Sequence, residues 1–100
     1  MTMSNRKLLT IITEVALESM LGREIEKLGA HGYTITDARG KGSRGKRNAD
    51  WGSSANIRVE VICDETTANR ICEHLRQNYY DDYAMIVVLS DVAVLRPEKF

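Results

Sequence analysis

The sequence predicts an α+β protein with one four-stranded antiparallel sheet and two helices on one face of that sheet, the ferredoxin-like arrangement. Two observations lead to this prediction. Apolar residues recur with strand spacing and with helix spacing in the order strand, helix, strand, strand, helix, strand. The chain has 100 residues, a length typical of one domain, so residues 1–100 are interpreted as a single domain.

The first strand and the first helix are predicted within residues 7–29. Residues 7–13 are rich in Leu, Ile and Thr, a composition that is typical of strands. Thr13 or Glu14 is expected to begin the helix, and Gly29 is expected to end it. Between these limits the apolar residues recur at helical spacing, at Leu17, Met20, Leu21, Ile25 and Leu28.

The second and third strands are predicted at residues 33–38 and 56–63. In the first of these segments Tyr and Ile alternate with Thr, and in the second Ile and Val alternate with charged residues. Residues 39–55 between them are rich in glycine, serine and charged residues and offer almost nothing to bury. A flexible loop is therefore expected there. Loops of this length in compact domains are usually functional or disordered.

The second helix and the fourth strand complete the pattern. Asp64 is a good N-cap, and an apolar stripe follows it at Ala68, Ile71, Cys72, Leu75 and Tyr79. Residues 78–82 break the helix, and the valine-rich residues 83–95 form the fourth strand. Cys63 and Cys72 lie on apolar stripes without metal or redox spacing, so both are expected to be reduced core thiols.

The first and fourth strands carry apolar residues on both faces, among them Leu8, Leu9, Ile11, Ile12, Met85, Ile86, Val87, Val88 and Leu89. Continuous apolar strands indicate burial on both sides of a sheet. Two helices cover only one face, and the chain supplies no second layer. Another copy of the chain is therefore expected to cover the other face.

Charge is balanced over the whole chain but concentrated in one place. Fourteen basic and 14 acidic residues give a formal net charge of zero, which favours neither nucleic acid nor an anionic membrane as a partner. Residues 39–47 nevertheless hold Arg39, Lys41, Arg44, Lys46 and Arg47 without an acidic residue. Glycine backbone N–H groups and arginine side chains both bind phosphate oxygens, so this segment predicts an anion site.

Two familiar phosphate-binding motifs match this segment only in part. Gly40, Gly42 and Gly45 have the spacing of the glycines in dinucleotide-binding folds. Gly40, Gly45 and Lys46 match part of the P-loop motif. Both motifs need a helix to follow at once, whereas a strand follows here. The P-loop also needs Ser or Thr where this chain has Arg47. Neither motif is therefore assigned.

Further features exclude other classes of protein. The apolar run of residues 8–12 is too short for a signal peptide or a membrane span, so a cytoplasmic location is expected. His31 and His74 are isolated from each other and from the cysteines in the pattern, so no metal site is expected. No pair of nucleophile and base stands out, so the chain is not expected to be an enzyme.

Four runs of sequence resemble one known family. Residues 32–37, residues 40–44, residues 81–84 and the opening residues 7–14 are similar to the PII signalling proteins. The resemblance is most specific to the PII-like regulators of inorganic carbon uptake, including the carboxysome-associated ones and those that partner a bicarbonate transporter. It implies a homotrimer with a nucleotide in each cleft between neighbouring subunits.

The resemblance also implies which residues bind. The glycine-rich run and Arg47 would hold phosphates, Thr34 would meet adenine, and residues 82–84 and Arg96 would line the cleft. The implied nucleotide-binding residues are Thr34, Gly40, Lys41, Gly42, Ser43, Arg44, Arg47, Asp82, Tyr83, Ala84 and Arg96. Bicarbonate would bind beside the phosphates at Lys41, Gly42 and Ser43. The expected ligands are AMP or ADP, with ATP and cyclic AMP left open, and no covalent cofactor.

The leading hypothesis is a regulator whose loop docks on, or releases, a target protein such as a bicarbonate transporter or a carboxysome component. Residues 39–55 hold no glutamine and no tyrosine, so neither 2-oxoglutarate sensing nor nucleotidylation is expected by analogy with nitrogen-sensing relatives. A nucleic-acid-binding ferredoxin-like module is one alternative, although the first and third strands lack the aromatic residues that such modules stack on bases. A weak nucleotide hydrolase is the other alternative.

Overall fold

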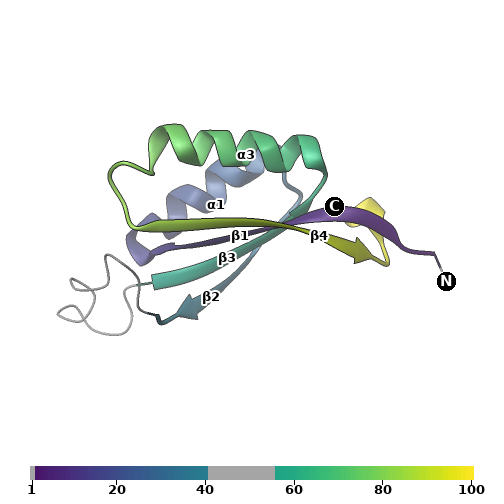
Figure 1. The fold of residues 1–100 in the computed structure, drawn as a ribbon, viewed down its shortest axis with the longest axis horizontal. Helices are drawn as coiled ribbons and strands as arrows, with labels where there is room; N and C mark the ends of the chain where they lie inside the picture. Colours follow the sequence, from purple (N-terminus) through teal and green to yellow (C-terminus); the bar gives the residue numbers. More distant parts are fainter. Residues whose placement is uncertain (1, 41–55) are drawn as a thin grey trace.

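The computed structural model describes residues 2–40 and 56–100 (Figure 1). Four strands, two α-helices and two short 3-10 turns follow one another along these residues. Their bounds are β1 (Ser4–Glu14), η1 (Val15–Leu17), α1 (Glu18–Lys27), β2 (Thr34–Ala38), β3 (Asn56–Cys63), α3 (Glu65–Asn78), β4 (Met85–Val94) and η3 (Pro97–Lys99). The predicted βαββαβ order is confirmed.

The four strands form one antiparallel sheet in the order β2-β3-β1-β4. Thr34 of β2 pairs with Glu60 of β3, Glu60 pairs with Thr10 of β1, and Thr10 pairs with Val88 of β4. These four residues therefore form one row across the sheet. Because side chains in neighbouring rows point to opposite faces, this register decides which residues meet the helices and which do not.

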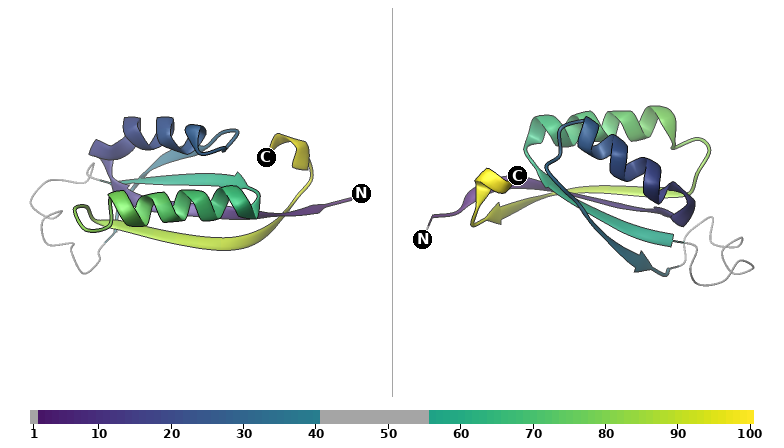
Figure 2. Two further views of the ribbon diagram at one scale, coloured as in Figure 1. Left: turned by 90° about the horizontal axis from the view of Figure 1, so that it is seen from above. Right: turned by 180° about the vertical axis from the view of Figure 1, so that it is seen from behind.

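Both helices lie on one face of the sheet and enclose the hydrophobic core (Figure 2). Leu9, Ile11, Val59 and Val61 point from the sheet into this layer and are fully buried. The helices complete the core from the other side with Leu17, Leu21, Ile25, Ala68, Ile71 and Leu75. Full burial of a large aliphatic side chain contributes about 1.5–3 kcal/mol, so these stripes hold the helices on the sheet.

The helix ends agree with the sequence at three of four points, and one of these is the end of α3 at Asn78, where the predicted break begins. The Asp64 carboxylate accepts a hydrogen bond of 2.8 Å from the Thr67 N–H, which confirms the predicted N-cap of α3. Gly29 follows α1 with a φ of +119°, a conformation that favours glycine. The predicted start of α1 is wrong. Glu14 remains extended, with φ −74° and ψ 139°, and the α-helix begins only at Glu18.

The strand bounds also differ from the prediction. β1 is longer than expected because Ser4 to Arg6 pair with Val92 to Val94 of β4. β2 begins one residue later, at Thr34. β4 begins at Met85, because the Tyr83 N–H still donates to the Tyr79 carbonyl and so belongs to the turn that follows α3.

The described residues leave most of the face of the sheet away from the helices uncovered, especially along β4. Ile86 and Val88 point to this side and are 55% and 51% exposed, although the sequence predicted burial on both faces of their strand. Leu8 and Ile12 of β1 lie beside them and are half-buried. One chain thus leaves an apolar surface open, which we call the open face.

Neither described helix is long and apolar enough to cross a lipid bilayer.

Candidate functional site

A pocket of about 290 Å³ opens on the open face beside the start of β2. Three parts of the chain meet there: the turn that leads into β2, the outward-facing residues of β2 and β3, and the C-terminal residues. The pocket is lined by His31, Gly32, Tyr33, Thr34, Glu60, Ile62, Lys99 and Phe100. We call it the β2 pocket.

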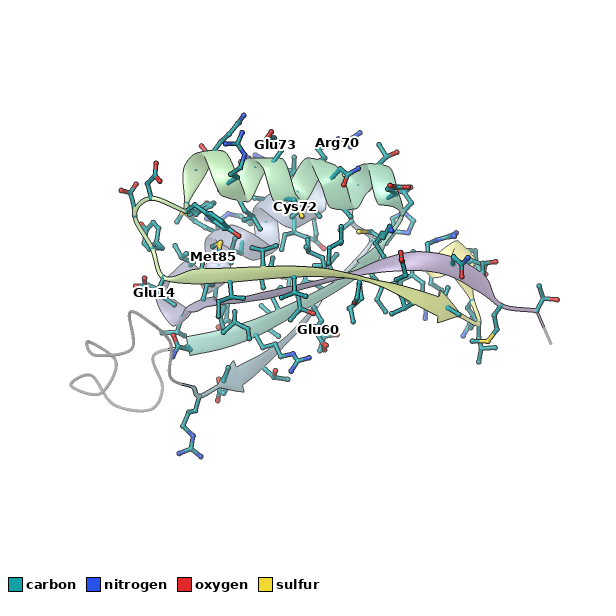
Figure 3. All side chains as sticks on the ribbon, in the orientation of Figure 1. Glu14, Glu60, Arg70, Cys72, Glu73 and Met85 are labelled. Atoms are coloured by element: carbon teal, nitrogen blue, oxygen red, sulfur yellow. The ribbon has the colours of Figure 1, made fainter. Side chains whose placement is uncertain are left out.

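The strand register brings the central residues of the β2 pocket together. Thr34 and Glu60 are direct cross-strand neighbours, and Ile62 is the next residue of β3 on the same face. Figure 3 shows the Glu60 side chain on the side of the sheet away from the helices. Glu60 also accepts a hydrogen bond of 3.2 Å from Arg58, so its carboxylate is held at this face.

Two hydrogen bonds hold the C-terminal turn beside the β2 pocket. Arg6 donates from Nη2 to the Pro97 carbonyl over 3.2 Å, and His31 Nδ1 lies 3.1 Å from the Lys99 carbonyl. Through these contacts the chain crosses from the edge of the sheet at β4 toward β2, as the view from above in Figure 2 shows. Lys99 and Phe100 consequently line a pocket whose other walls come from β2, β3 and the turn before β2, all far from the C-terminus in the sequence.

Gly22 of α1 gives the neighbouring Tyr33 room to pack. A Cβ atom at Gly22 would lie only 2.4 Å from the Tyr33 hydroxyl oxygen, so a larger residue would push the ring away. Tyr33 remains 40% exposed and lines the β2 pocket. Ile62 and Phe100 give the β2 pocket an apolar wall, Thr34 a hydroxyl and Glu60 a carboxylate. This combination suits a planar ligand with a polar edge.

A second group of predicted residues lies in the turn between α3 and β4. The Asp82 and Tyr83 N–H groups donate to the Tyr79 carbonyl over 3.1 and 3.0 Å. The Ala84 N–H donates to Glu14 Oε2 over 2.8 Å, and the Ala84 carbonyl accepts from the Thr13 hydroxyl over 2.8 Å. The N–H groups of Asp82, Tyr83 and Ala84 thus all donate to acceptors within the same chain.

The turn continues into a polar network that links α1 with α3. Glu24 Oε1 accepts from the Tyr79 hydroxyl over 2.7 Å and lies 2.6 Å from His74 Nε2. Burial opposes ionisation of Glu24, but the hydrogen bonds from Tyr79 and His74 outweigh it and lower the pKa of Glu24. Burial and the Glu24 carboxylate together raise the pKa of Tyr79 to about 12. Both side chains therefore keep their ordinary charge state at neutral pH.

The two groups of predicted residues do not meet within one chain. Thr34 lies on edge strand β2 in the row of Val88, and Ala84 precedes the other edge strand, β4. About 14 Å across three strand spacings and about 13 Å along the strands therefore separate Thr34 from Ala84. Gly40 follows the end of β2, which lies about 13 Å along the strand from Thr34. A ligand that touches both groups must lie between two copies of the chain.

The other predicted residues stand as follows. Arg96 is exposed between β4 and η3, with its Nε 3.7 Å from Glu98 Oε2. Lys41, Gly42, Ser43, Arg44 and Arg47, and with them the implied bicarbonate site, lie outside the described residues, as does most of the expected flexible loop. Within residues 2–40 and 56–100, no three metal-binding side chains come together.

Sequence reasoning identified only Thr34 among the pocket residues and missed the other seven: His31, Gly32, Tyr33, Glu60, Ile62, Lys99 and Phe100. The alternation of β3 indicates that Glu60 and Ile62 face away from the core, which is a usable signal. Their position beside Thr34 depends on the strand register. The approach of the C-terminal turn depends on tertiary contacts, for which the sequence holds no local pattern.

The fold and the β2 pocket define a class: ferredoxin-like α+β proteins with a pocket on the uncovered face of the sheet. Comparison with known families makes the assignment more specific. The family model described as Nitrogen regulatory protein P-II matches residues 6–99. The chain therefore belongs to the P-II family.

Solved structures of PII-like proteins match nearly the whole chain. A protein from Thermus thermophilus, assigned as a PII-like signalling protein, is 47% identical over 100% of this chain and 99% of that chain, with a TM-score of 0.85. CPII, a nitrogen regulatory PII-like protein from Thiomonas intermedia, has a structure bound to ADP, AMP and bicarbonate. It is 25% identical over 99% of this chain and 100% of that chain, with a TM-score of 0.80. CPII bound to ADP and bicarbonate is 26% identical over 99% of this chain and 97% of that chain, with a TM-score of 0.84.

Proposed function

We propose that this protein is a PII-like regulator that binds an adenine nucleotide, AMP or ADP, between neighbouring copies of the chain. The β2 pocket is the single observation that carries the proposal, because it is a ligand-sized hollow on a face that one chain leaves open. The structures of CPII with ADP, AMP and bicarbonate support the choice of ligand. Residues 1–100 act as one domain in this proposal.

The base of the nucleotide occupies the β2 pocket. The Glu60 carboxylate is an acceptor suited to the exocyclic amine of adenine, and the Thr34 hydroxyl can donate to or accept from a ring nitrogen. Ile62 and the nearby aromatic residue Phe100 supply apolar surface for the faces of the base. Arg96 adds positive charge near the same end of the chain.

The phosphates are bound by the neighbouring copy. The phosphate-binding residues that the resemblance to PII proteins implies are Gly40, Lys41, Gly42, Ser43, Arg44 and Arg47. Asp82, Tyr83 and Ala84, whose N–H groups are bonded within the chain, would line the cleft beside them. Thr34 and Ala84 stand on opposite edges of one sheet, which is why two copies are needed. The exposed Ile86 and Val88 supply apolar surface for the contact between copies. We propose a homotrimer, as the resemblance to PII proteins implies.

The proposal extends to bicarbonate and to a target protein. Lys41, Gly42 and Ser43 are the proposed bicarbonate ligands, in keeping with the bicarbonate in the CPII structures. Nucleotide and bicarbonate would together set the state of residues 39–55, and that segment would engage a target in the cytoplasm. A bicarbonate transporter or a carboxysome component fits this role. The protein binds its ligands without turning them over, and ATP and cyclic AMP are further candidate ligands.

Titration calorimetry tests the proposal directly. AMP, ADP, ATP and cyclic AMP are titrated into the protein with and without bicarbonate, while light scattering reports the mass of the assembly. The Glu60→Ala variant should lose affinity for every adenine nucleotide while keeping the wild-type mass. Phosphate release from ADP and ATP is followed in parallel. A wild-type protein that binds none of the four nucleotides, or that binds them as a monomer, contradicts the proposal.

A further inference from the structure

Two side chains at the end of β1 hold Ala84 at both of its polar backbone atoms. Glu14 accepts from the Ala84 N–H and Thr13 donates to the Ala84 carbonyl, each over 2.8 Å. We infer that Glu14, together with Thr13, is a positioning residue of the nucleotide site, because it fixes the turn of residues 79–84 in the shape that receives the ligand. This inference rests on the proposed function.

The two bonds fix both peptide groups that flank Ala84. The N–H belongs to the peptide that joins Tyr83 to Ala84, and the carbonyl belongs to the peptide that joins Ala84 to Met85. Neither peptide can rotate without breaking a bond that is partly shielded from water. Thr13 is only 1% exposed, so its hydroxyl has little access to water as a substitute partner. The bond to the Glu14 carboxylate is of the stronger, charge-assisted type.

The far end of the same turn is fixed separately. The Asp82 and Tyr83 N–H groups bond to the Tyr79 carbonyl, and the Tyr79 hydroxyl bonds to Glu24. The turn is thus held at Tyr79 by the helical layer and at Ala84 by β1. Loss of the bond to Glu14 would release one end only, so the fold should survive while the turn gains freedom.

Glu14 also lies where the ends of several strands meet the turn of residues 79–84. It pairs with Asn56, the first residue of β3, and Asn56 pairs with Ala38, the last residue of β2. The end of β2, the start of β3 and the turn before β4 therefore lie in adjoining rows around Glu14, near the start of β4 as Figure 3 shows. A residue at this junction can order the turn relative to the ends of both strands.

The same contacts explain why the helix does not start where the sequence predicts. Thr13 and Glu14 have side chains that commonly begin helices, but here both are committed to Ala84. Their backbone stays in β1, and α1 begins only at Glu18. The departure from the local prediction marks the place where tertiary hydrogen bonds outweigh helix propensity.

The experiment compares Glu14→Ala, Glu14→Gln and Thr13→Val with wild-type protein. Hydrogen exchange at the Ala84 amide, followed by NMR, reports the turn in the free protein, and calorimetry reports ADP affinity. Glu14→Ala should lose protection at Ala84 and weaken ADP binding about tenfold, because binding must then order the turn. Glu14→Gln keeps an acceptor oxygen and should restore most of both signals. Thr13→Val should weaken binding in the same direction.

Glu26→Ala is the matched control, since Glu26 is an exposed acidic residue of α1. It should leave Ala84 exchange and ADP affinity unchanged. Unchanged or tighter ADP binding in Glu14→Ala, with protection at Ala84 lost, overturns the inference and leaves the proposed function intact. Tighter binding would mean that the carboxylate competes with phosphate. Wild-type protein that binds no adenine nucleotide overturns both. If Glu14→Ala does not fold, Thr13→Val and Glu14→Gln decide by the same two measurements.

Discussion

Replacing Val88 with aspartate should dissociate the assembly without unfolding the chain. Val88 points away from the helices and is 51% exposed in one chain, so the monomer loses little when this side chain becomes charged. Exposed substitutions of this kind usually change stability by less than about 0.5 kcal/mol. The neighbouring Val87 points into the helical layer and packs against the core, so Val87→Asp should unfold the chain instead.

The magnitude for Val88 follows from its exposed half. Full burial of a valine contributes about 1.5–3 kcal/mol, so covering the remaining half in an assembly contributes about 1 kcal/mol for each copy. An aspartate at the same place loses this contribution and adds a desolvation penalty of several kcal/mol for each buried carboxylate. In a trimer the three penalties add, which is enough to prevent assembly at micromolar concentration.

Light scattering after gel filtration measures the mass, and circular dichroism measures the fold. Val88→Thr is the matched control, because it keeps the shape of the side chain without adding charge. We expect Val88→Asp to be a folded monomer and Val88→Thr to keep the wild-type mass. A Val88→Asp variant with the wild-type mass would refute the idea that copies of the chain meet over this part of the open face.

Three further predictions concern other parts of the molecule. Glu24→Gln should lower the free energy of unfolding at neutral pH in urea titrations. The contribution of ionised Glu24 is fully present above its ordinary pKa of 4.5 and disappears as the pH falls through its lower folded pKa, so the variant and wild type should converge in acid. Gly22→Ala should displace Tyr33 and weaken ADP binding with little change in melting temperature, since the better helix propensity of alanine offsets the clash. Burial raises the pKa of the Cys63 thiol to about 11, so a thiol reagent at pH 8 should modify it only after unfolding; rapid modification of the folded protein would contradict its place in the core.

Local pattern was sufficient for most of the fold. The alternation in β3 and the apolar stripe of α3 each state which side chains face the core, and the N-cap at Asp64 marks where α3 begins. The start of α1 was predicted wrongly because the hydrogen bonds of Thr13 and Glu14 run to Ala84, 70 or more residues away in the sequence.

The candidate site likewise has one part that the sequence predicts and one part that depends on tertiary contacts. The basic, glycine-rich residues 39–47 are visible as an anion-binding segment because their chemistry is contained in consecutive residues. The apolar residues on both faces of β1 and β4 also predict, from the sequence alone, that another copy of the chain covers the open face. Only the tertiary structure decided the β2 pocket and the hydrogen bonds of Thr13 and Glu14 to Ala84. Strand register and the path of the C-terminal turn bring Thr34, Glu60 and Phe100 together, and contacts between residues so distant in the chain leave no periodic trace in the sequence.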